Sequence, residues 1–116
     1  MDQKARQNVA AAKLLLDAAL VDSSMSRLYY ALFQACVHVF IRRGLHPADL
    51  GPYTDWKHST AKNHVYRARG RHADTAMFVE AYSLRLQADY RPQLVRTRDV
   101  AKLLPRVEDF VEEVCA

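Results

Sequence analysis

The chain has 116 residues, half of them hydrophobic and about a quarter charged, and this balance excludes a disordered polypeptide. Three glycines and four prolines are too few for the turns of an all-β protein, whereas the many alanines, leucines and arginines favour helices. The net charge is +4, with cationic residues gathered in 57–72 and 91–106. This polarity favours a polyanion or an acidic protein as the partner over a neutral small molecule.

No segment predicts a membrane span or a secretory leader. The longest apolar stretch, around residues 28–41, is too short and too polar for a transmembrane helix of about 20 residues. The opening MDQKARQNVAAAK lacks the apolar centre and cleavage site of a signal peptide. Cys36 and Cys115 lie in a helical pattern and at the chain end, so no structural disulfide is expected. We expect one cytoplasmic domain spanning residues 1–116, without membrane contact.

The first two predicted helices are amphipathic and apolar, respectively. The first runs from about Gln3 to Leu20 and places apolar residues on one face, namely Val9, Ala12, Leu16, Ala19 and Leu20. Asp22 or Ser23 can cap the second helix by accepting hydrogen bonds from exposed amides. That helix ends at Gly44 and is apolar nearly all round, which predicts a central position.

Three further helices follow a loop over residues 45–54. Asp55 is expected to cap the third helix, which continues to about Arg69 and ends at Gly70. The fourth spans roughly residues 73–90 and stops before a proline.

The fifth helix is expected to begin with Thr97 as its cap and to be kinked, without a break, at Pro105. The five segments together predict an all-α protein, an antiparallel bundle of four to five helices.

The fourth helix carries two charged residues on its apolar side. Arg85 and Asp89 are four residues apart and share the face of Phe78, Ala81 and Tyr82. Burying them costs several kcal/mol unless they are paired. One interpretation is a structural ion pair that locks this helix to Arg27, Tyr29 or Tyr30 of the second helix. The other is a polar pocket for phosphate, whose oxygens the planar arginine fork matches.

Four segments carry a resemblance to a known family: SRLYYALFQA, DWKHS, RLQADY and DVAKLLPRVEDFVEEV. In this order they resemble the HEPN domain family, in the branch whose small proteins often accompany minimal nucleotidyltransferases, and they cover essentially the whole chain. The resemblance implies an antiparallel helical bundle that forms a homodimer about its functional cleft, with no cofactor. Many such proteins are RNases acting as toxins in toxin–antitoxin or defence modules, and some are non-catalytic partners that bind RNA or a nucleotide.

The family's RNase motif is incomplete in this chain. It consists of an arginine and a histidine separated by four to six residues, and the arginine maps to Arg85. The histidine would fall on Tyr90, Arg91 or Pro92, none of which is histidine. If the protein cleaves RNA, the resemblance implies Arg85 for phosphate stabilisation and Tyr90, or a histidine of the third helix, for the proton. By position, Tyr90 also matches the tyrosine that a partner nucleotidyltransferase can modify.

The histidines have different sequence surroundings. Arg67 and His72 have the motif's spacing but straddle Gly70, so the match is attributed to chance. His64 shares a face with two alanines, which indicates a hydrogen-bonded core histidine or, failing that, a substitute base. His58, at the start of the third helix, either lies at the surface or lines the cleft.

No metal site is expected, because His38 and Cys36 have no further ligand pair at helical spacing.

The third helix and the turn after it are basic, and four residues there are candidate nucleic-acid contacts: Lys62, Arg67, Arg69 and Arg71. They lie on two edges and not in one stripe. Such a surface is either merely solvated, or contacts an RNA backbone in a salt-dependent way, or docks an acidic antitoxin.

The sequence thus predicts a HEPN-type component of a toxin–antitoxin or nucleotidyltransferase pair that binds RNA or a nucleotide. Its polar site combines Arg85, Asp89 and Tyr90 with Arg27, Tyr30 and His58. The alternatives are an active metal-independent RNase and a non-catalytic adaptor or oligomerisation module.

Overall fold

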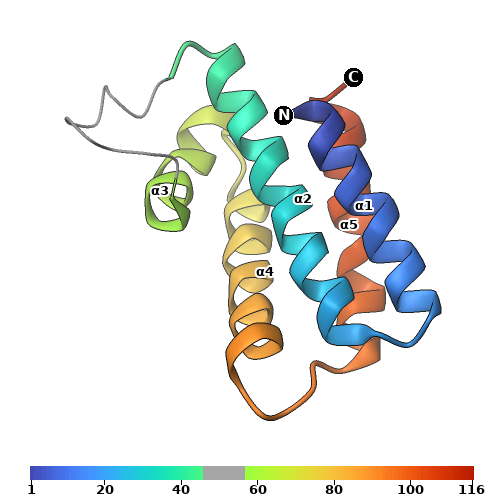
Figure 1. Ribbon diagram of the computed structural model, residues 1–116. Helices are drawn as coiled ribbons and strands as arrows, with labels where there is room; N and C mark the ends of the chain where they lie inside the picture. Colours follow the sequence, from blue (N-terminus) through green and yellow to red (C-terminus); the bar gives the residue numbers. More distant parts are fainter. Residues whose placement is uncertain (46–56) are drawn as a thin grey trace.

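The computed structural model describes residues 1–45 and 57–116, and it places most of them in five α-helices. In chain order these are α1 (Asp2–Asp17), α2 (Val21–Arg42), α3 (His58–Arg69), α4 (His72–Tyr90) and α5 (Thr97–Val114) (Figure 1). The described residues contain no β-strand. The prediction of an all-α helical bundle is therefore confirmed.

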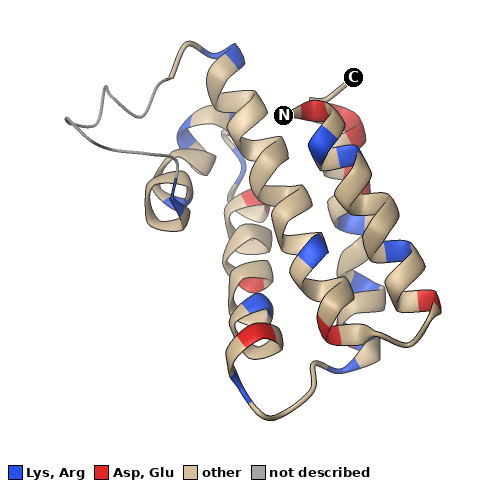
Figure 2. Cartoon of the chain, in the orientation of Figure 1, with Lys and Arg blue, Asp and Glu red and all other residues tan. Residues whose placement is uncertain are grey.

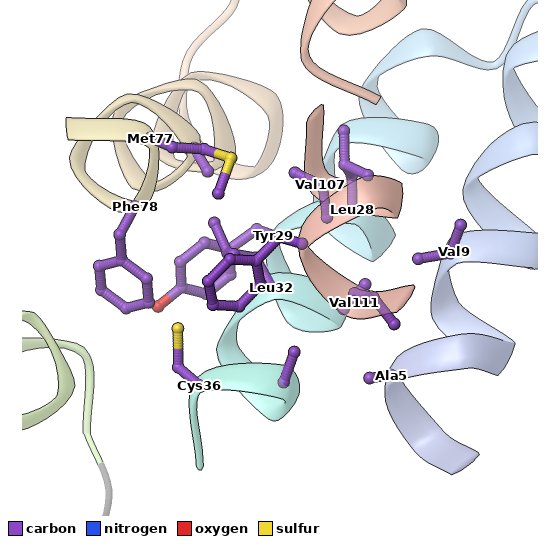
Figure 3. Close-up of a cluster of buried hydrophobic side chains, with 14 of the residues drawn as sticks. Ala5, Val9, Leu28, Tyr29, Leu32, Cys36, Met77, Phe78, Val107 and Val111 are labelled. Carbon is purple, nitrogen blue, oxygen red and sulfur yellow. The ribbon is translucent and has the colours of Figure 1, made fainter. Parts of the chain in front are cut away.

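Helix α2 is the centre of the bundle because it is apolar on nearly every side. It packs against each of the other four helices, whereas the shorter α3 packs chiefly on α2 and α4. Leu28, Tyr29, Leu32 and Cys36 of α2 are buried between α1, α4 and α5 (Figure 3). Each fully buried leucine of this kind stabilises the fold by about 1.5–3 kcal/mol.

Polar groups on the inner side of α1 and α2 are satisfied between these two helices. The Ser24 hydroxyl, which is fully buried, donates to the carbonyl oxygen of Ala12 at 2.7 Å. The Asn8 amide donates to the Gln34 side-chain oxygen at 2.8 Å. Buried polar groups paired in this way carry no large desolvation cost, so they fix the register of α1 on α2.

Two expectations at the α1–α2 turn are wrong. Helix α1 ends at Asp17, because the chain turns at Ala19 with a φ of 62° and leaves Leu20 half exposed. Helix α2 already begins at Val21, so neither Asp22 nor Ser23 caps it. The Asp22 carboxylate instead accepts a hydrogen bond from the Val95 amide at 2.9 Å. It therefore fastens the α4–α5 loop to the start of α2.

The other helix ends agree with the sequence more closely. Gly44 and Gly70 adopt the left-handed φ values of 75° and 69° that end α2 and α3. Thr97 does not cap α5, since it lies inside the helix after Arg96. Asp55, the expected cap of α3, lies outside the described residues. Helix α5 continues unbroken through Pro105.

In the parts of the chain that are described, no helix is both long enough and apolar enough to cross a membrane. The two cysteines are buried and free. Burial raises the pKa of both thiols above the ordinary value.

Candidate functional site

Arg85 lies at the meeting point of α2 and α4. Its Nη2 donates to the Tyr30 hydroxyl at 3.0 Å, and its Nε lies 2.9 Å from an oxygen of Asp89. The guanidinium carbon is 5.5 Å from the ring centres of Tyr29, Tyr30 and Tyr90. At that distance the positive charge is attracted to each ring face. The structure thus brings together Arg85, Asp89, Tyr90 and Tyr30, as the sequence suggested.

The cluster lies at the edge of the bundle, which corrects the expectation of a fully internal site. Adjacent tyrosines on a helix point about 100° apart. Tyr29 is therefore buried at 3% exposure, while Tyr30 is 37% exposed and Tyr90 is 71% exposed. The Arg85 side chain retains 17% exposure. A ligand in solvent can therefore reach the guanidinium.

His58, the first residue of α3, joins the cluster from a third helix. Its Nδ1 lies 3.1 Å from the Tyr29 hydroxyl, and its ring stacks on Tyr82 and Phe78 at centre distances of 3.3 and 5.0 Å. His58 is thus partly buried against α2 and α4 and does not lie freely at the surface, whereas its place in a functional cleft stays a prediction. We call the following residues the Arg85 cluster: Tyr29, Tyr30, His58, Arg85, Asp89 and Tyr90.

The electrostatics of the cluster keep His58 neutral at neutral pH. Burial lowers the pKa of His58 to about 4, and the positive charges of Lys62 and Arg85 act in the same direction. Burial also raises the pKa of Tyr29 well above the ordinary tyrosine value, although Arg85 partly opposes this. The Tyr29 phenol therefore stays protonated and forms one hydrogen bond with the imidazole of His58. The tautomer of the imidazole determines which of the two groups donates.

Arg85 retains donor capacity for a ligand. Its protein contacts engage Nη2 and Nε, and among the described residues none engages Nη1. Nε is buried and, despite its closeness to Asp89, makes no hydrogen bond of good geometry with any described residue. A guanidinium has five N–H donors in a planar fork. The site can therefore bind one more oxyanion without losing the Tyr30 bond.

Arg27 does not join this cluster. It is exposed on α2, one turn before Tyr30, and no described residue contacts it through a hydrogen bond or ion pair. It lines an open groove of about 560 Å³ that Tyr30 and Asp89 also line. We call this the Arg27 groove.

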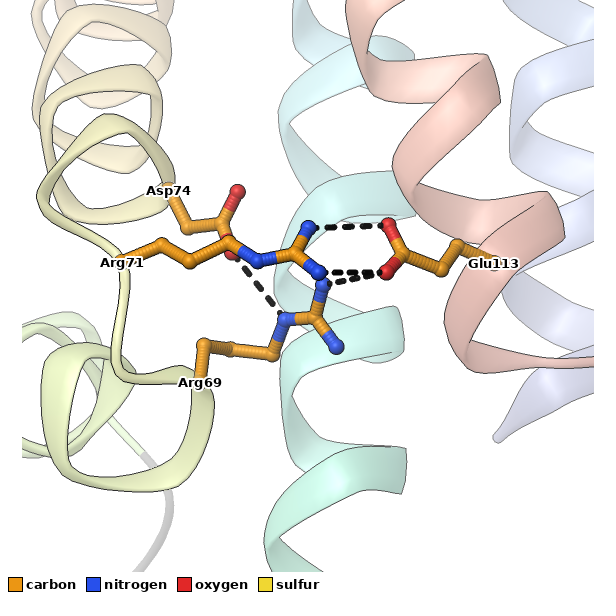
Figure 4. A network of polar contacts seen from close by, with 4 residues as sticks. All are labelled: Arg69, Arg71, Asp74 and Glu113. Atoms are coloured by element: carbon orange, nitrogen blue, oxygen red, sulfur yellow. Dashed lines mark hydrogen bonds and ion pairs between the residues drawn. The ribbon is translucent and has the colours of Figure 1, made fainter.

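The four basic residues predicted to contact nucleic acid divide into two pairs. Lys62 and Arg67 are exposed on α3. Arg69 instead forms ion pairs with two other helices: its Nε lies 3.0 Å from Oδ2 of Asp74 in α4, and its Nη2 lies 3.0 Å from Oε1 of Glu113 in α5 (Figure 4).

Arg71 also contacts Glu113, at 3.1 Å. Figure 2 shows lysine and arginine positions spread along the helices among acidic ones, without a single basic stripe. The prediction that these residues contact RNA stays a prediction, and the internal ion pairs of Arg69 and Arg71 compete with it.

The remaining histidines have structural surroundings. His64 is buried, and its Nδ1 lies 2.9 Å from the Thr60 carbonyl oxygen, which agrees with a core histidine. His72 stacks on Tyr66 across the α3–α4 turn. Its candidate motif partner Arg67 is exposed on α3, so the two lie on either side of Gly70. Over residues 1–45 and 57–116, no three potential ligand side chains gather as a metal site requires.

Sequence reasoning missed the aromatic neighbours of His58. Phe78 and Tyr82 are four residues apart and precede Arg85 on the same face of α4. This spacing was the available signal, but it indicated only an inner face and not a stack on a histidine from another helix.

Comparisons with known proteins leave the family open. No known family model matches the chain, and no curated protein shows significant similarity to it. The resemblance to the HEPN family therefore stays a prediction that depends on the four segments quoted above.

Proposed function

We propose that the protein binds RNA or a nucleotide through a phosphate at the Arg85 cluster. In this proposal it is a cytoplasmic, homodimeric HEPN-type component of a toxin–antitoxin or nucleotidyltransferase pair. The observation that carries the proposal is the state of Arg85. It is held in place by a phenol and by one carboxylate of its own helix, yet it is reachable from solvent and has an unused arm.

The arginine suits a phosphate for electrostatic reasons. Three tyrosine rings surround the guanidinium and exclude part of the solvent. In such surroundings a charge-assisted hydrogen bond is stronger than in water. Asp89 is four residues away on the same helix and its side chain is 27% exposed, so it can yield to a stronger oxyanion.

The position of α3 adds positive potential on the same side. His58 opens α3, and a helix N-terminus carries roughly half a positive charge. The N-cap residue, Lys57, contributes a cation and no side-chain acceptor. Lys62 is close enough to lower the pKa of His58. These groups favour an anion beside Arg85.

Exposed aromatic rings supply a surface for nucleobases. Tyr90 and Tyr30 project at the rim of the cluster with 71% and 37% exposure. A base stacked on an aromatic side chain gains about 1–3 kcal/mol with little sequence preference. Phosphate capture and base stacking together point to single-stranded RNA or a nucleotide as the ligand.

Cleavage of RNA is the second candidate function, and His58 is the observation that favours it. Its imidazole contacts Tyr29, whose ring also lies against Arg85, so a histidine is present although the sequence motif lacks one. A general base works best with a pKa near the working pH. The pKa of His58, lowered to about 4, is far from neutrality, so we propose binding as the main function.

A single assay separates these functions. A fluorescent single-stranded oligoribonucleotide is incubated with the protein and chelator, and both anisotropy and cleavage are followed. Arg85→Ala is expected to weaken binding roughly tenfold or more, because a charge-assisted hydrogen bond contributes about 1.5–3 kcal/mol. The matched control is Arg106→Ala, since Arg106 pairs with Glu80 at the surface and its loss changes the net charge equally.

The outcomes decide between the proposals. Binding that depends on Arg85 and not on Arg106 supports the binding function. Cleavage that Arg85→Ala abolishes supports the RNase. A wild-type protein that binds neither RNA nor nucleotide contradicts both, and leaves an adaptor or oligomerisation module in which the cluster is a brace. Sedimentation of the wild type tests the proposed homodimer.

A further inference from the structure

The Arg27 groove has the size and polarity of a small-ligand site. It lies between the end of α1, the first half of α2 and the end of α4, and its volume is about 560 Å³. Pockets that hold small organic ligands usually measure about 300–1,000 Å³. Its walls include two serines, one arginine and two carboxylates. A ligand with several hydrogen-bonding groups fits this lining better than a hydrocarbon.

The groove is continuous with the Arg85 cluster. Tyr30 and Asp89 form part of its wall, and both contact Arg85 directly. If a ligand places an anionic group on Arg85, the next part of that ligand can therefore pass the ring of Tyr30 and enter the groove.

The interior of the groove favours an uncharged, donor-rich group. The carboxylates of Asp22 and Asp89 face it, and they repel phosphate but accept hydrogen bonds. One oxygen of Asp22 is engaged by the Val95 amide, and one oxygen of Asp89 is close to Arg85. The remaining acceptor capacity matches ribose hydroxyls and base amino groups. The 2′-hydroxyl is one such donor, and DNA lacks it.

Arg27 supplies a second cation at the groove. It is exposed, and none of the described residues pairs with it. Other exposed arginines such as Arg42 likewise contact no carboxylate among the described residues, but Arg27 is the arginine that lines this groove. An unpaired guanidinium beside a neutral tyrosine is suited to a phosphate.

We propose that the Arg27 groove holds one nucleoside of a single-stranded RNA whose two flanking phosphates lie on Arg85 and Arg27. Tyr30, which accepts the hydrogen bond of Arg85 and lines the groove together with Arg27, contacts the sugar or base in this proposal. This inference rests on the proposed function, because it assigns the Arg85 phosphate to a particular residue of the strand. It adds the ligand class, a ribonucleoside with a phosphate on each side.

The test compares two probes that differ by one phosphate. Adenosine 5′-monophosphate and adenosine 3′,5′-bisphosphate are titrated into the wild type, Arg27→Ala, Arg85→Ala and Arg42→Ala by calorimetry. Arg42 is the matched control, because it is a second exposed arginine of α2 but lies outside the groove. We expect the wild type to bind the bisphosphate roughly tenfold more tightly, as one charge-assisted contact allows.

Arg27→Ala is expected to remove that preference and to leave the monophosphate unchanged, whereas Arg42→Ala changes neither. For an oligoribonucleotide, Arg27→Ala should reduce the slope of log binding constant against log salt concentration by the amount expected for about one lost phosphate contact. Ser23→Trp fills the groove from an exposed position and should weaken both nucleotides while sparing inorganic phosphate.

Two results overturn the inference, and only the second of them also overturns the proposed function. If Arg85→Ala abolishes nucleotide binding but Arg27→Ala and Ser23→Trp leave it unchanged, the groove is not the nucleoside site and the proposed function stands. If the wild type binds neither probe nor RNA, the proposed function fails together with the inference.

Discussion

Two arginines of this protein, Arg69 and Arg85, are similarly buried, but one forms ion pairs with other helices and the other forms an ion pair within its own helix. Their side chains are 14% and 17% exposed, and Arg69 lies against one aromatic ring while Arg85 lies against three. Arg69 of α3 is paired with carboxylates of α4 and α5. Arg85 is paired with a carboxylate of its own helix, and its bond to another helix is to a neutral phenol.

This difference indicates that Arg69 stabilises the packing of the helices, whereas Arg85 is the candidate ligand contact. Ion pairs between helices hold α3 against α4 and α5, so the free energy of unfolding depends on Arg69. An i,i+4 pair within one helix typically contributes only about 0.2–0.5 kcal/mol. Among the described residues, Arg85 therefore makes no ion pair between helices and contacts α2 through the two tyrosines alone, so in the proposed function its charge is available to a ligand.

Replacing Arg69 should have the largest effect on stability. Arg69→Met retains much of the apolar stem but leaves the Asp74 carboxylate, 13% exposed, without its partner. Breaking a buried pair in this way costs about 3 kcal/mol. Urea denaturation followed by circular dichroism measures the change, with Arg106→Ala as the exposed control, expected to lose less than about 1 kcal/mol. A loss below that of the control would show that the network of Figure 4 is not a brace.

Replacing Arg85 by lysine should impair binding far more than folding. Arg85→Lys keeps the charge but removes the planar fork, so RNA binding is expected to weaken by about 2 kcal/mol, roughly thirtyfold. The free energy of unfolding should change by less than about 1 kcal/mol. Anisotropy and urea denaturation on the same preparation test both. Equal losses of stability in Arg85→Lys and Arg69→Met would remove the distinction between the two arginines.

Acidification should destabilise the Arg85 side of the bundle through His58. Its pKa is about 4 in the folded protein and near 6.5 in an unfolded chain. Between these values the unfolded chain binds the additional proton, so this contribution to stability is complete above about pH 6.5 and is lost as the pH falls towards about 4. Because His58 is only partly buried, solvent screens this effect and we expect about 1 kcal/mol.

The pH effect is measured as a difference between two proteins. Urea denaturation of the wild type and of His58→Gln is repeated between about pH 7 and pH 4.5. The carboxylates titrate in both, so only the wild type should show the extra loss. A wild-type slope equal to that of the variant would mean that His58 is not buried against Tyr29 and Tyr82.

The smallest expected effect belongs to the phenol that holds Arg85. Tyr30→Phe removes the hydroxyl that accepts the Arg85 hydrogen bond and keeps the ring. Loss of this partly exposed bond should cost about 0.5 kcal/mol of stability. RNA affinity should fall by less than in Arg85→Lys. A larger loss of affinity than in Arg85→Lys would assign the main ligand contact to the hydroxyl and not to the arginine.

Periodicity alone predicted the helices well, because apolar spacing determines which faces are buried. The central position of α2 and the ends at Gly44 and Gly70 followed from local composition. The cap expected from Asp22 failed because a tertiary contact decides how its side chain is used. Asp22 could serve its own helix, but the Val95 amide, distant in sequence, takes its oxygen.

The candidate site was predictable only where its residues share a helix. Arg85 and Asp89 lie together because of their four-residue spacing. The spacing could not show that Arg69 is paired with Glu113 while Arg27 is left exposed, because each outcome depends on how a third helix packs. The stack of His58 on Tyr82 likewise requires the packing of α3 on α4.

The buried thiol of Cys36 gives the protein an internal reporter of its own opening. Its side chain is 1% exposed at the centre of α2, and its raised pKa suppresses the reactive thiolate. Reaction with a thiol reagent therefore requires that α2 separates from its neighbours. Cys115, at 7% exposure after the last helix, reports on the C-terminal end. The ratio of the two alkylation rates thus compares, without any added label, the opening of the core around α2 with the local fraying of the C-terminal end.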